Sequence, residues 1–162
     1  MMKEVELVQI SRTGEPERTV DPLPEAIRQV CGATAAFHQR IGFDPPWVGY
    51  VSVCNGKAVG GGGFKDAPAR GEVEIAYFTL SDLEGQGYAT ATARALTTLA
   101  RHAAPDITVI AQTLPERNAS NTLLQKLGFA FAGVVDHPED GLVWEWHAPA
   151  PPQARAVCGV RV

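Results

Sequence analysis

The sequence predicts a mixed α/β (α+β) fold in one domain. Three observations lead to this prediction. The chain has 162 residues, 45% of them apolar, which is enough for one hydrophobic core. Segments with strand-like alternation and segments with helical spacing of apolar residues follow one another along the chain. At residues 80–88 a strand-like segment passes through a turn with two glycines into a helix-like segment.

The first half of the chain predicts a strand, a helix and a β-hairpin. Residues 5–10 suggest the strand. A helix is expected to open at the prolines of 22–24 and to run to about Ile41, as one long helix or two short ones. Residues 47–53 are rich in β-branched and aromatic side chains, and the Asn-Gly pair that follows is a strong hairpin turn, so 58–65 is the return strand.

The second half predicts a central strand followed by two helices and three further strands. Residues 72–80 alternate well enough to form the central strand. From Gly87 onward apolar residues recur at helical spacing, on Ala89, Ala93, Leu96 and Ala100. The remaining expected elements are a short buried strand, a helix closed by a glycine, and a last hairpin, at 107–111, 118–128, 129–135 and 142–146.

Composition and charge limit the partners. A net charge of -4 gives no broad attraction to nucleic acid or to an anionic membrane, so neither is expected as a partner. The three cysteines are few, odd in number and widely spaced, which argues against a disulfide framework and suits a cytoplasmic location. The histidines have no metal-ligand spacing, so no metal is expected. We expect one domain over 1–148 and a Pro- and Ala-rich tail or packing segment over 149–162.

The glycine turn at 84–89 (EGQGYA) predicts a phosphate-binding site. Gly85 and Gly87 let successive backbone N–H groups converge, and the helix that follows directs its positive end to the same point. A dinucleotide-binding turn uses the same physics, but its third glycine is replaced here by Thr90, and this turn follows a hairpin rather than a first strand. A pyrophosphate is therefore the expected ligand, and a simple tight turn is the alternative.

Two blocks of the sequence resemble the GNAT acetyltransferases. The turn looks like the family's Gln/Arg-x-x-Gly-x-Gly/Ala signature, and 85–90 looks like the branch of the ribosomal-protein N-terminal acetyltransferases. The blocks 115–120 (PERNAS) and 124–129 (LQKLGF) resemble that branch's Asn-x-Ser helix and its Glu-Lys-x-Gly-Phe end. The resemblance spans about 47–146. It implies a mostly antiparallel central sheet flanked by helices, with a splayed central strand pair that holds acetyl-CoA.

By this resemblance, acetyl-CoA is the co-substrate. Freed backbone groups of the central strand would pair with its pantetheine arm like an added strand. The expected cofactor-binding residues are Tyr77, Phe78, Thr79, Glu84, Gly85, Gln86, Gly87, Tyr88, Ala89, Thr90, Asn118 and Ser120. Helix capping is the alternative role for Asn118 and Ser120. Glu84 stands where the family has Gln or Arg, so its carboxylate is expected to weaken binding of the pyrophosphate.

The expected proton-transfer residues are Glu74 and Ser120. Glu72 and Glu74 share one face of the central strand, and the resemblance matches Glu74 to a Glu that precedes a Gly/Ala-Tyr pair. Glu74 would take the proton of the amine, and an ordinary half-exposed carboxylate is the alternative. Many family members carry a proton-donating Tyr where this chain has Leu124, so Ser120, one helical turn earlier, is the expected donor. A backbone N–H near Phe78 would stabilise the oxyanion.

The acceptor is expected to enter between the first helix and the last hairpin. Trp47, Glu74 and Trp144 are the expected substrate-binding residues, with core packing as the alternative for the aromatic ones. The expected activity is transfer of an acetyl group from acetyl-CoA to a primary amine, on a protein N-terminus or a small molecule, by direct attack in a ternary complex. We expect a monomer or homodimer. A catalytically silent acyl-CoA-binding module and a nucleotide-binding regulatory domain are the alternatives.

Overall fold

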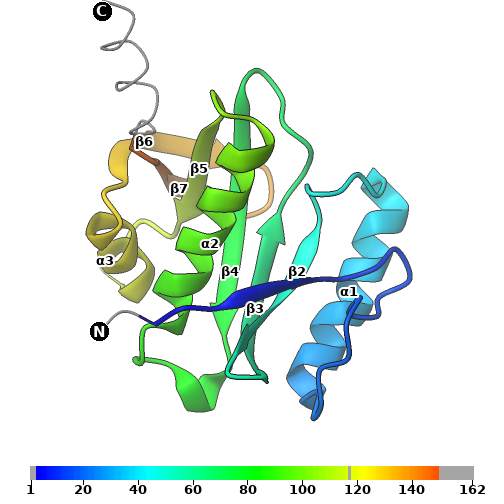
Figure 1. The fold of residues 1–162 in the computed structure, drawn as a ribbon. Helices are drawn as coiled ribbons and strands as arrows, with labels where there is room; N and C mark the ends of the chain where they lie inside the picture. Colours follow the sequence, from blue (N-terminus) through cyan, green and yellow to red (C-terminus); the bar gives the residue numbers. More distant parts are fainter. Residues whose placement is uncertain (1–2, 117, 150–162) are drawn as a thin grey trace, which may run out of the picture.

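The order of strands and helices follows the sequence pattern. The computed structural model describes residues 3–116 and 118–149. Within them the elements are β1 (Glu6–Gln9), α1 (Glu25–Ile41), β2 (Gly49–Cys54), β3 (Lys57–Phe64), β4 (Glu72–Thr79), the 3-10 helix η1 (Ser81–Leu83), α2 (Tyr88–Ala103), β5 (Thr108–Thr113), α3 (Ala119–Lys126), β6 (Ala130–His137) and β7 (Gly141–His147) (Figure 1). The predicted fold class is confirmed, and η1 is the one addition. The first predicted helix is a single continuous helix.

The strands form a mixed sheet in the order β1-β2-β3-β4-β5-β7-β6. All neighbouring pairs are antiparallel except β4 and β5, which run parallel. The β4–β5 ladder ends at the pair Ile75↔Ala111, although β4 continues to Thr79 and β5 to Thr113. The two central strands therefore splay apart in the middle of the sheet, as the resemblance implied.

Helices cover both faces of the sheet. Adjacent residues of a strand point to opposite faces. On β2, Tyr50 packs in the core cluster that contains Leu96 of α2 and Leu124 of α3, whereas its neighbour Val51 packs in the cluster that contains Ile27 of α1. Hence α2 and α3 cover one face and α1 covers the other; α2 lies across the front of the sheet in Figure 1.

Four consecutive glycines, 60–63, form half of β3. A Cβ atom at Gly60 would lie 2.2 Å from the carbonyl oxygen of Phe78, and one at Gly63 would lie 2.6 Å from that of Val48. Both distances are too short for a real contact, so β3 approaches its two neighbours more closely than a strand with side chains can. This close approach leaves a floor without side chains beneath α1.

The described chain ends at Pro149, whose carbonyl accepts a hydrogen bond from the guanidinium of Arg101. The predicted tail over 149–162 otherwise lies outside the described residues, so its packing stays a prediction. None of the helices described here combines the length with the apolar character needed to cross a bilayer.

Candidate active site

A cleft of about 650 Å³ opens where β4 and β5 separate. That volume is within the usual range for small-molecule sites. Three elements supply its walls: the end of β4 with the turn that follows, the first residues of α2, and one side of α3. Its lining residues are Tyr77, Phe78, Thr79, Glu84, Gly85, Gly87, Tyr88, Ala89, Thr90, Ala119, Ser120, Thr122, Leu123 and Lys126. Ten of the twelve predicted cofactor-binding residues are therefore brought together, and Gln86 and Asn118 lie outside the lining.

The glycine turn presents the uncapped end of α2 to this cleft. Gly85 has φ 80° and Gly87 has φ 92°, values that favour glycine. Gly87 is the N-cap residue, and no side chain of the described chain caps the helix. The first N–H groups of α2 consequently lack intrahelical partners and form the positive end of the helix dipole, which suits an anion.

Two charged side chains line the same cleft from opposite walls. Glu84 is exposed at the head of the turn, where its negative charge would repel a phosphate group. Lys126 lies at the end of α3. The sequence reasoning missed Lys126 together with Ala119, Thr122 and Leu123. Their spacing of three and four residues along one helix face is the signal that could have identified them.

The backbone of β4 faces the cleft at alternate residues. Hydrogen bonds from the N–H of Lys65 to the carbonyl of Glu74 and from the N–H of Leu80 to the carbonyl of Val59 fix the phase of the β3–β4 ladder. By the alternation of an antiparallel ladder, Phe78 then exchanges its backbone hydrogen bonds with Gly61 of β3.

Tyr77 and Thr79 therefore direct their backbone groups into the gap where β5 has separated from β4. The expectation that Phe78 would also offer backbone groups to the cleft is wrong, because β3 already takes them. Its backbone N–H cannot serve as the oxyanion donor in this arrangement, and Tyr77 and Thr79 are the available donors. The side-chain hydroxyl of Thr79 is also buried and has no partner among the described residues.

Asn118 and Ser120, the two residues predicted from the sequence at the start of α3, differ in their surroundings. The side chain of Asn118 accepts a hydrogen bond of 3.0 Å from the N–H of Asn121, so Asn118 is the N-cap residue of α3. Ser120 lines the cleft. Leu124, at the position where many relatives have a Tyr, is fully buried in the core and supplies no polar group.

Tyr77 lines the same cleft as Ser120. Burial raises the pKa of Tyr77, and a hydrogen bond from the Ser120 side chain lowers it in part. The phenol thus keeps its proton at neutral pH.

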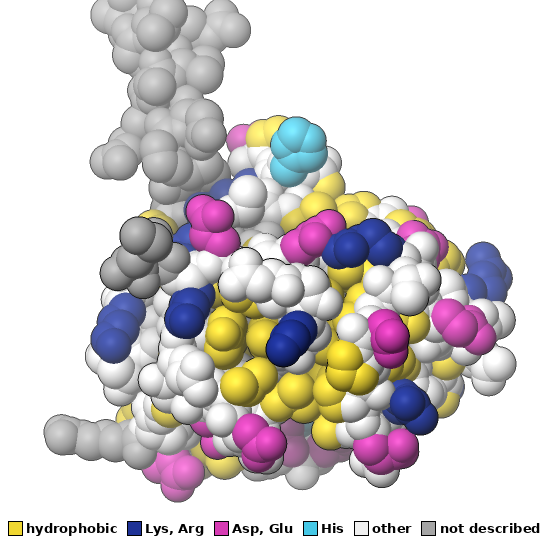
Figure 2. Space-filling model, turned by 60° about the horizontal axis from the view of Figure 1, so that its bottom comes forward, with side chains coloured by type: hydrophobic (Ala, Val, Ile, Leu, Met, Phe, Trp, Pro, Cys, Tyr) yellow, Lys and Arg dark blue, Asp and Glu magenta, His cyan; other side chains and the backbone are white. Residues whose placement is uncertain are grey.

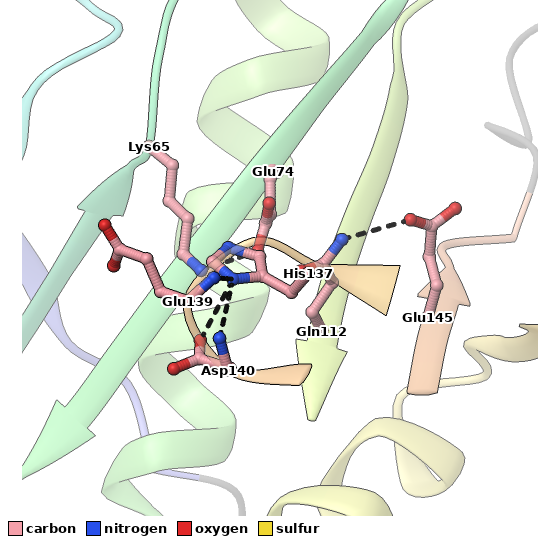
Figure 3. Close-up of polar contacts among 7 residues, drawn as sticks. All are labelled: Lys65, Glu74, Gln112, His137, Glu139, Asp140 and Glu145. Carbon is pink, nitrogen blue, oxygen red and sulfur yellow. Dashed lines mark hydrogen bonds and ion pairs between the residues drawn. The ribbon is translucent and has the colours of Figure 1, made fainter. Parts of the chain in front are cut away.

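Glu74 lies on the opposite face of the sheet, toward α1. Its carboxylate is 2.8 Å from the ammonium of Lys65 (Figure 3). The Glu74 side chain is 18% exposed and that of Lys65 is 45% exposed. The predicted base is therefore paired with a cation that lines the groove described below, whereas Glu74 itself is not among the lining residues. The sequence did not predict this pairing.

A groove on this face joins the cleft at Phe78. One part, of about 450 Å³, runs between α1 and the glycine floor of β3, and a second part continues to η1. Val30, Ala33 and Phe78 line both parts, and Phe78 also lines the cleft on the other face. Figure 2 turns the lower end of Figure 1 forward and shows hydrophobic side chains gathered among charged ones at that end of the molecule.

Polar residues from β5, β7 and the β6–β7 turn lie on the same side as Glu74 (Figure 3). Glu145 of β7 accepts a hydrogen bond of 3.3 Å from Gln112 of β5 and lies 3.0 Å from the ring of His147. At the turn, Nδ1 of His137 accepts hydrogen bonds of 3.1 Å from two backbone N–H groups, which fixes the turn's shape. No group of three potential metal ligands occurs among the described residues.

The two tryptophans predicted to bind the acceptor line neither the cleft nor the groove. The ring of Trp47 packs edge-on against Phe64, with 5.1 Å between centroids. Trp144 packs in the same manner against Phe131, at 5.7 Å. Both contact the core that α2 and α3 cover, so the structure favours the core-packing alternative for them.

Comparison with known proteins identifies the family. Residues 6–130 match the model of the acetyltransferase (GNAT) domain. No curated protein matches the chain significantly. An apo structure of RimL, ribosomal L7/L12 alpha-N-protein acetyltransferase, is 19% identical, with a TM-score of 0.64 over 89% of this chain and 92% of that one.

Two ligand-bound structures share the fold as well. RimJ of Mycobacterium smegmatis in complex with CoA-disulfide is 23% identical, with a TM-score of 0.57 over 82% of this chain and 68% of that one. YncA of Salmonella typhimurium, a putative acetyltransferase with its cofactor acetyl-CoA, is 21% identical, with a TM-score of 0.57 over 85% and 78%. The domain match covers more than half of the sequence, and the chain belongs to the GNAT acetyltransferase family.

Proposed function

We propose that this protein is an N-acetyltransferase that moves the acetyl group of acetyl-CoA to a primary amine by direct attack in a ternary complex. One observation carries the proposal. The cleft at the parted strands and the groove under α1 lie on opposite faces of the sheet and meet at Phe78. Two substrates that enter from opposite faces would bring their reacting atoms together there.

The cleft suits the donor. Its uncapped helix N-terminus provides N–H groups for the pyrophosphate, and Lys126 provides a cation. The free backbone groups of Tyr77 and Thr79 can pair with the amide groups of a pantetheine arm, as an added strand would. Structures of the same fold were determined with CoA-disulfide and with acetyl-CoA.

The groove suits the acceptor. Its walls are mostly apolar and its floor is glycine, and Lys65, the partner of Glu74, is one of its lining residues. A primary amine enters as an ammonium ion and must lose a proton before it attacks. Glu74 is paired with Lys65, which lines the groove, and in this proposal Glu74 takes that proton directly or through a water molecule.

The chemical step needs an anion site for the developing oxyanion. In the proposed complex the amine nitrogen attacks the thioester carbonyl, and the carbonyl oxygen gains negative charge. The backbone N–H groups of Tyr77 and Thr79 are the donors that face this region. The acceptor itself is a protein N-terminus or a small amine; RimL, which shares the fold, is described as an alpha-N-protein acetyltransferase.

Release of CoA thiol tests the proposal. The purified chain is mixed with acetyl-CoA and a panel of small amines and peptides with free N-termini. We expect thiol release that depends on at least one amine and falls at least tenfold in Glu74→Gln. Binding of CoA without amine-dependent thiol release would favour the silent acyl-CoA-binding module. Thermal stabilisation by ATP or NAD but not by CoA would favour a nucleotide-binding domain.

A further inference from the structure

The departing thiolate of CoA needs a proton, and the cleft offers few groups that can give one. Two phenols line it, those of Tyr77 and Tyr88. Tyr88 is the first residue of α2, at the end of the cleft assigned to the pyrophosphate, and the ammonium of Lys3 lies 5.1 Å from its ring centroid. Tyr77 lies on β4, past the point where β4 and β5 part, where the thioester is expected.

The side chain of Tyr77 is directed toward α3. Val73 and Ile75, two and four residues earlier on β4, are buried in the core that contains Leu124 of α3, and Tyr77 packs against the same core. Its backbone faces the cleft as well. The ring is therefore fixed by packing while its edge borders the cleft, which is the arrangement needed for a positioned proton donor.

Ser120 connects this phenol to solvent. Ser120 and Tyr77 line the same cleft, the Ser120 side chain is one of the two causes that act on the pKa of Tyr77, and Ser120 is only half-buried. A serine hydroxyl by itself is a very weak acid. In contact with a phenol on one side and with water on the other, it can pass a proton along without becoming charged.

We propose that Tyr77 is the proton donor to the thiolate leaving group, with Ser120 as its link to water. The amine nitrogen forms the C–N bond as the C–S bond breaks, and the electron pair of that bond goes to sulfur. The sulfur takes the phenolic proton of Tyr77, which recovers a proton from water through Ser120. The amine's own proton leaves separately, so the products are the amide and neutral CoA thiol. The assignment rests on the proposed acetyl transfer.

Tyr77→Phe tests the assignment because it keeps the ring and removes only the hydroxyl. With the amine that works best in wild type, we expect kcat to fall about 100-fold. The KM for acetyl-CoA and the dissociation constant of CoA should change less than threefold. In wild type, kcat should fall at alkaline pH as the phenol of Tyr77 loses its proton. Measured after brief pH jumps, this fall should be missing in the variant, a change that a purely structural role would not produce.

Ser120→Ala is the second variant, since truncation of a half-exposed side chain on α3 leaves the core intact. We expect its kcat to fall about tenfold, with unchanged CoA affinity. A kcat within twofold of wild type in Tyr77→Phe would overturn the assignment. So would parallel losses of kcat and CoA affinity, or an unfolded Tyr77→Phe beside a fully active Ser120→Ala. Absence of amine-dependent turnover in wild type would instead contradict the acetyl transfer itself.

Discussion

The ammonium nitrogen of Lys65 lies 2.8 Å from a carboxylate oxygen of Glu74. The two residues are also neighbours in the pairing of β3 with β4, where the N–H of Lys65 donates a 3.0 Å hydrogen bond to the carbonyl of Glu74. If Glu74 is the base, as proposed, the ammonium of Lys65 occupies the place where the ammonium of an acceptor would meet it. In that reaction Lys65 would compete with the substrate for Glu74.

Lys65→Met should therefore improve the use of amines. Removing a half-exposed ion pair frees the carboxylate, and such pairs are worth at most about 1 kcal/mol, so the KM for the amine is expected to fall up to about fivefold. Steady-state kinetics with a cationic amine measures this. Lys57→Met removes the same charge at the start of β3 and should leave the KM unchanged. A higher KM in Lys65→Met would show that Lys65 assists the acceptor.

Glu84→Gln should tighten acetyl-CoA binding. Glu84 lines the cleft beside the turn that is proposed to hold the pyrophosphate, and its negative charge repels phosphate. We expect the dissociation constant to fall about two- to fivefold, and more at low salt than at high salt. Calorimetry at two salt concentrations gives the comparison. Glu139→Gln removes an equal charge from the β6–β7 turn and serves as the control; equal affinities in all three proteins would contradict the repulsion.

Gly87→Val should abolish CoA binding. Gly87 has φ 92°, a conformation that costs a β-branched residue about 1–3 kcal/mol, and its carbonyl and N–H open α2 at the cleft. Gly56→Val is the matched control, because Gly56 has φ 80° in the β2–β3 turn and nothing lies near its added Cβ. Both variants should lose similar thermal stability. CoA binding that survives in Gly87→Val would contradict the pyrophosphate site.

His38 should make the fold less stable in mild acid. It is buried and packs edge-on against Phe43, with 5.0 Å between centroids. Burial is the main cause that lowers the pKa of His38 in the folded state, with the charge of Arg12 adding to it and the backbone of Ser11 opposing it. The unfolded chain then binds a proton more readily, so stability is full above about pH 6.5 and falls as the pH drops below it.

The measurement is the melting temperature of wild type and His38→Phe at pH 7 and pH 5. Phenylalanine fills nearly the same volume and carries no proton, so the variant should lose less stability on acidification. His102→Gln, at an exposed position near the end of α2, is the control and should behave as wild type does. An equal acid loss in wild type and His38→Phe would remove His38 as its source.

The sequence predicted the fold well because its signals are local. Asn55-Gly56, the alternation of 72–80 and the stripe on α2 each depend on neighbouring residues, and every expected strand and helix is present. The glycine turn and the capping role of Asn118 were predictable for the same reason, since both depend on the first turn of one helix.

What the sequence did not reveal depends on how distant segments align. The Lys65–Glu74 pair needs the register of β3 against β4, and the phase of that ladder decides that Tyr77 and Thr79, not Phe78, face the cleft. The core positions of Trp47 and Trp144 likewise depend on which face of the sheet each ring meets. No short-range pattern carries this information.

The glycine run of β3 also bears on how the chain folds. A segment without side chains has little preference for an extended backbone and nothing to bury, so it cannot nucleate structure by itself. We expect β2 and β4 to be organised first, with β3 joining them after the rate-limiting barrier has been crossed. Substitutions along 60–63 would then accelerate unfolding far more than they slow refolding. The strand β3, although it is paired on both sides, would be the last strand of the sheet to form.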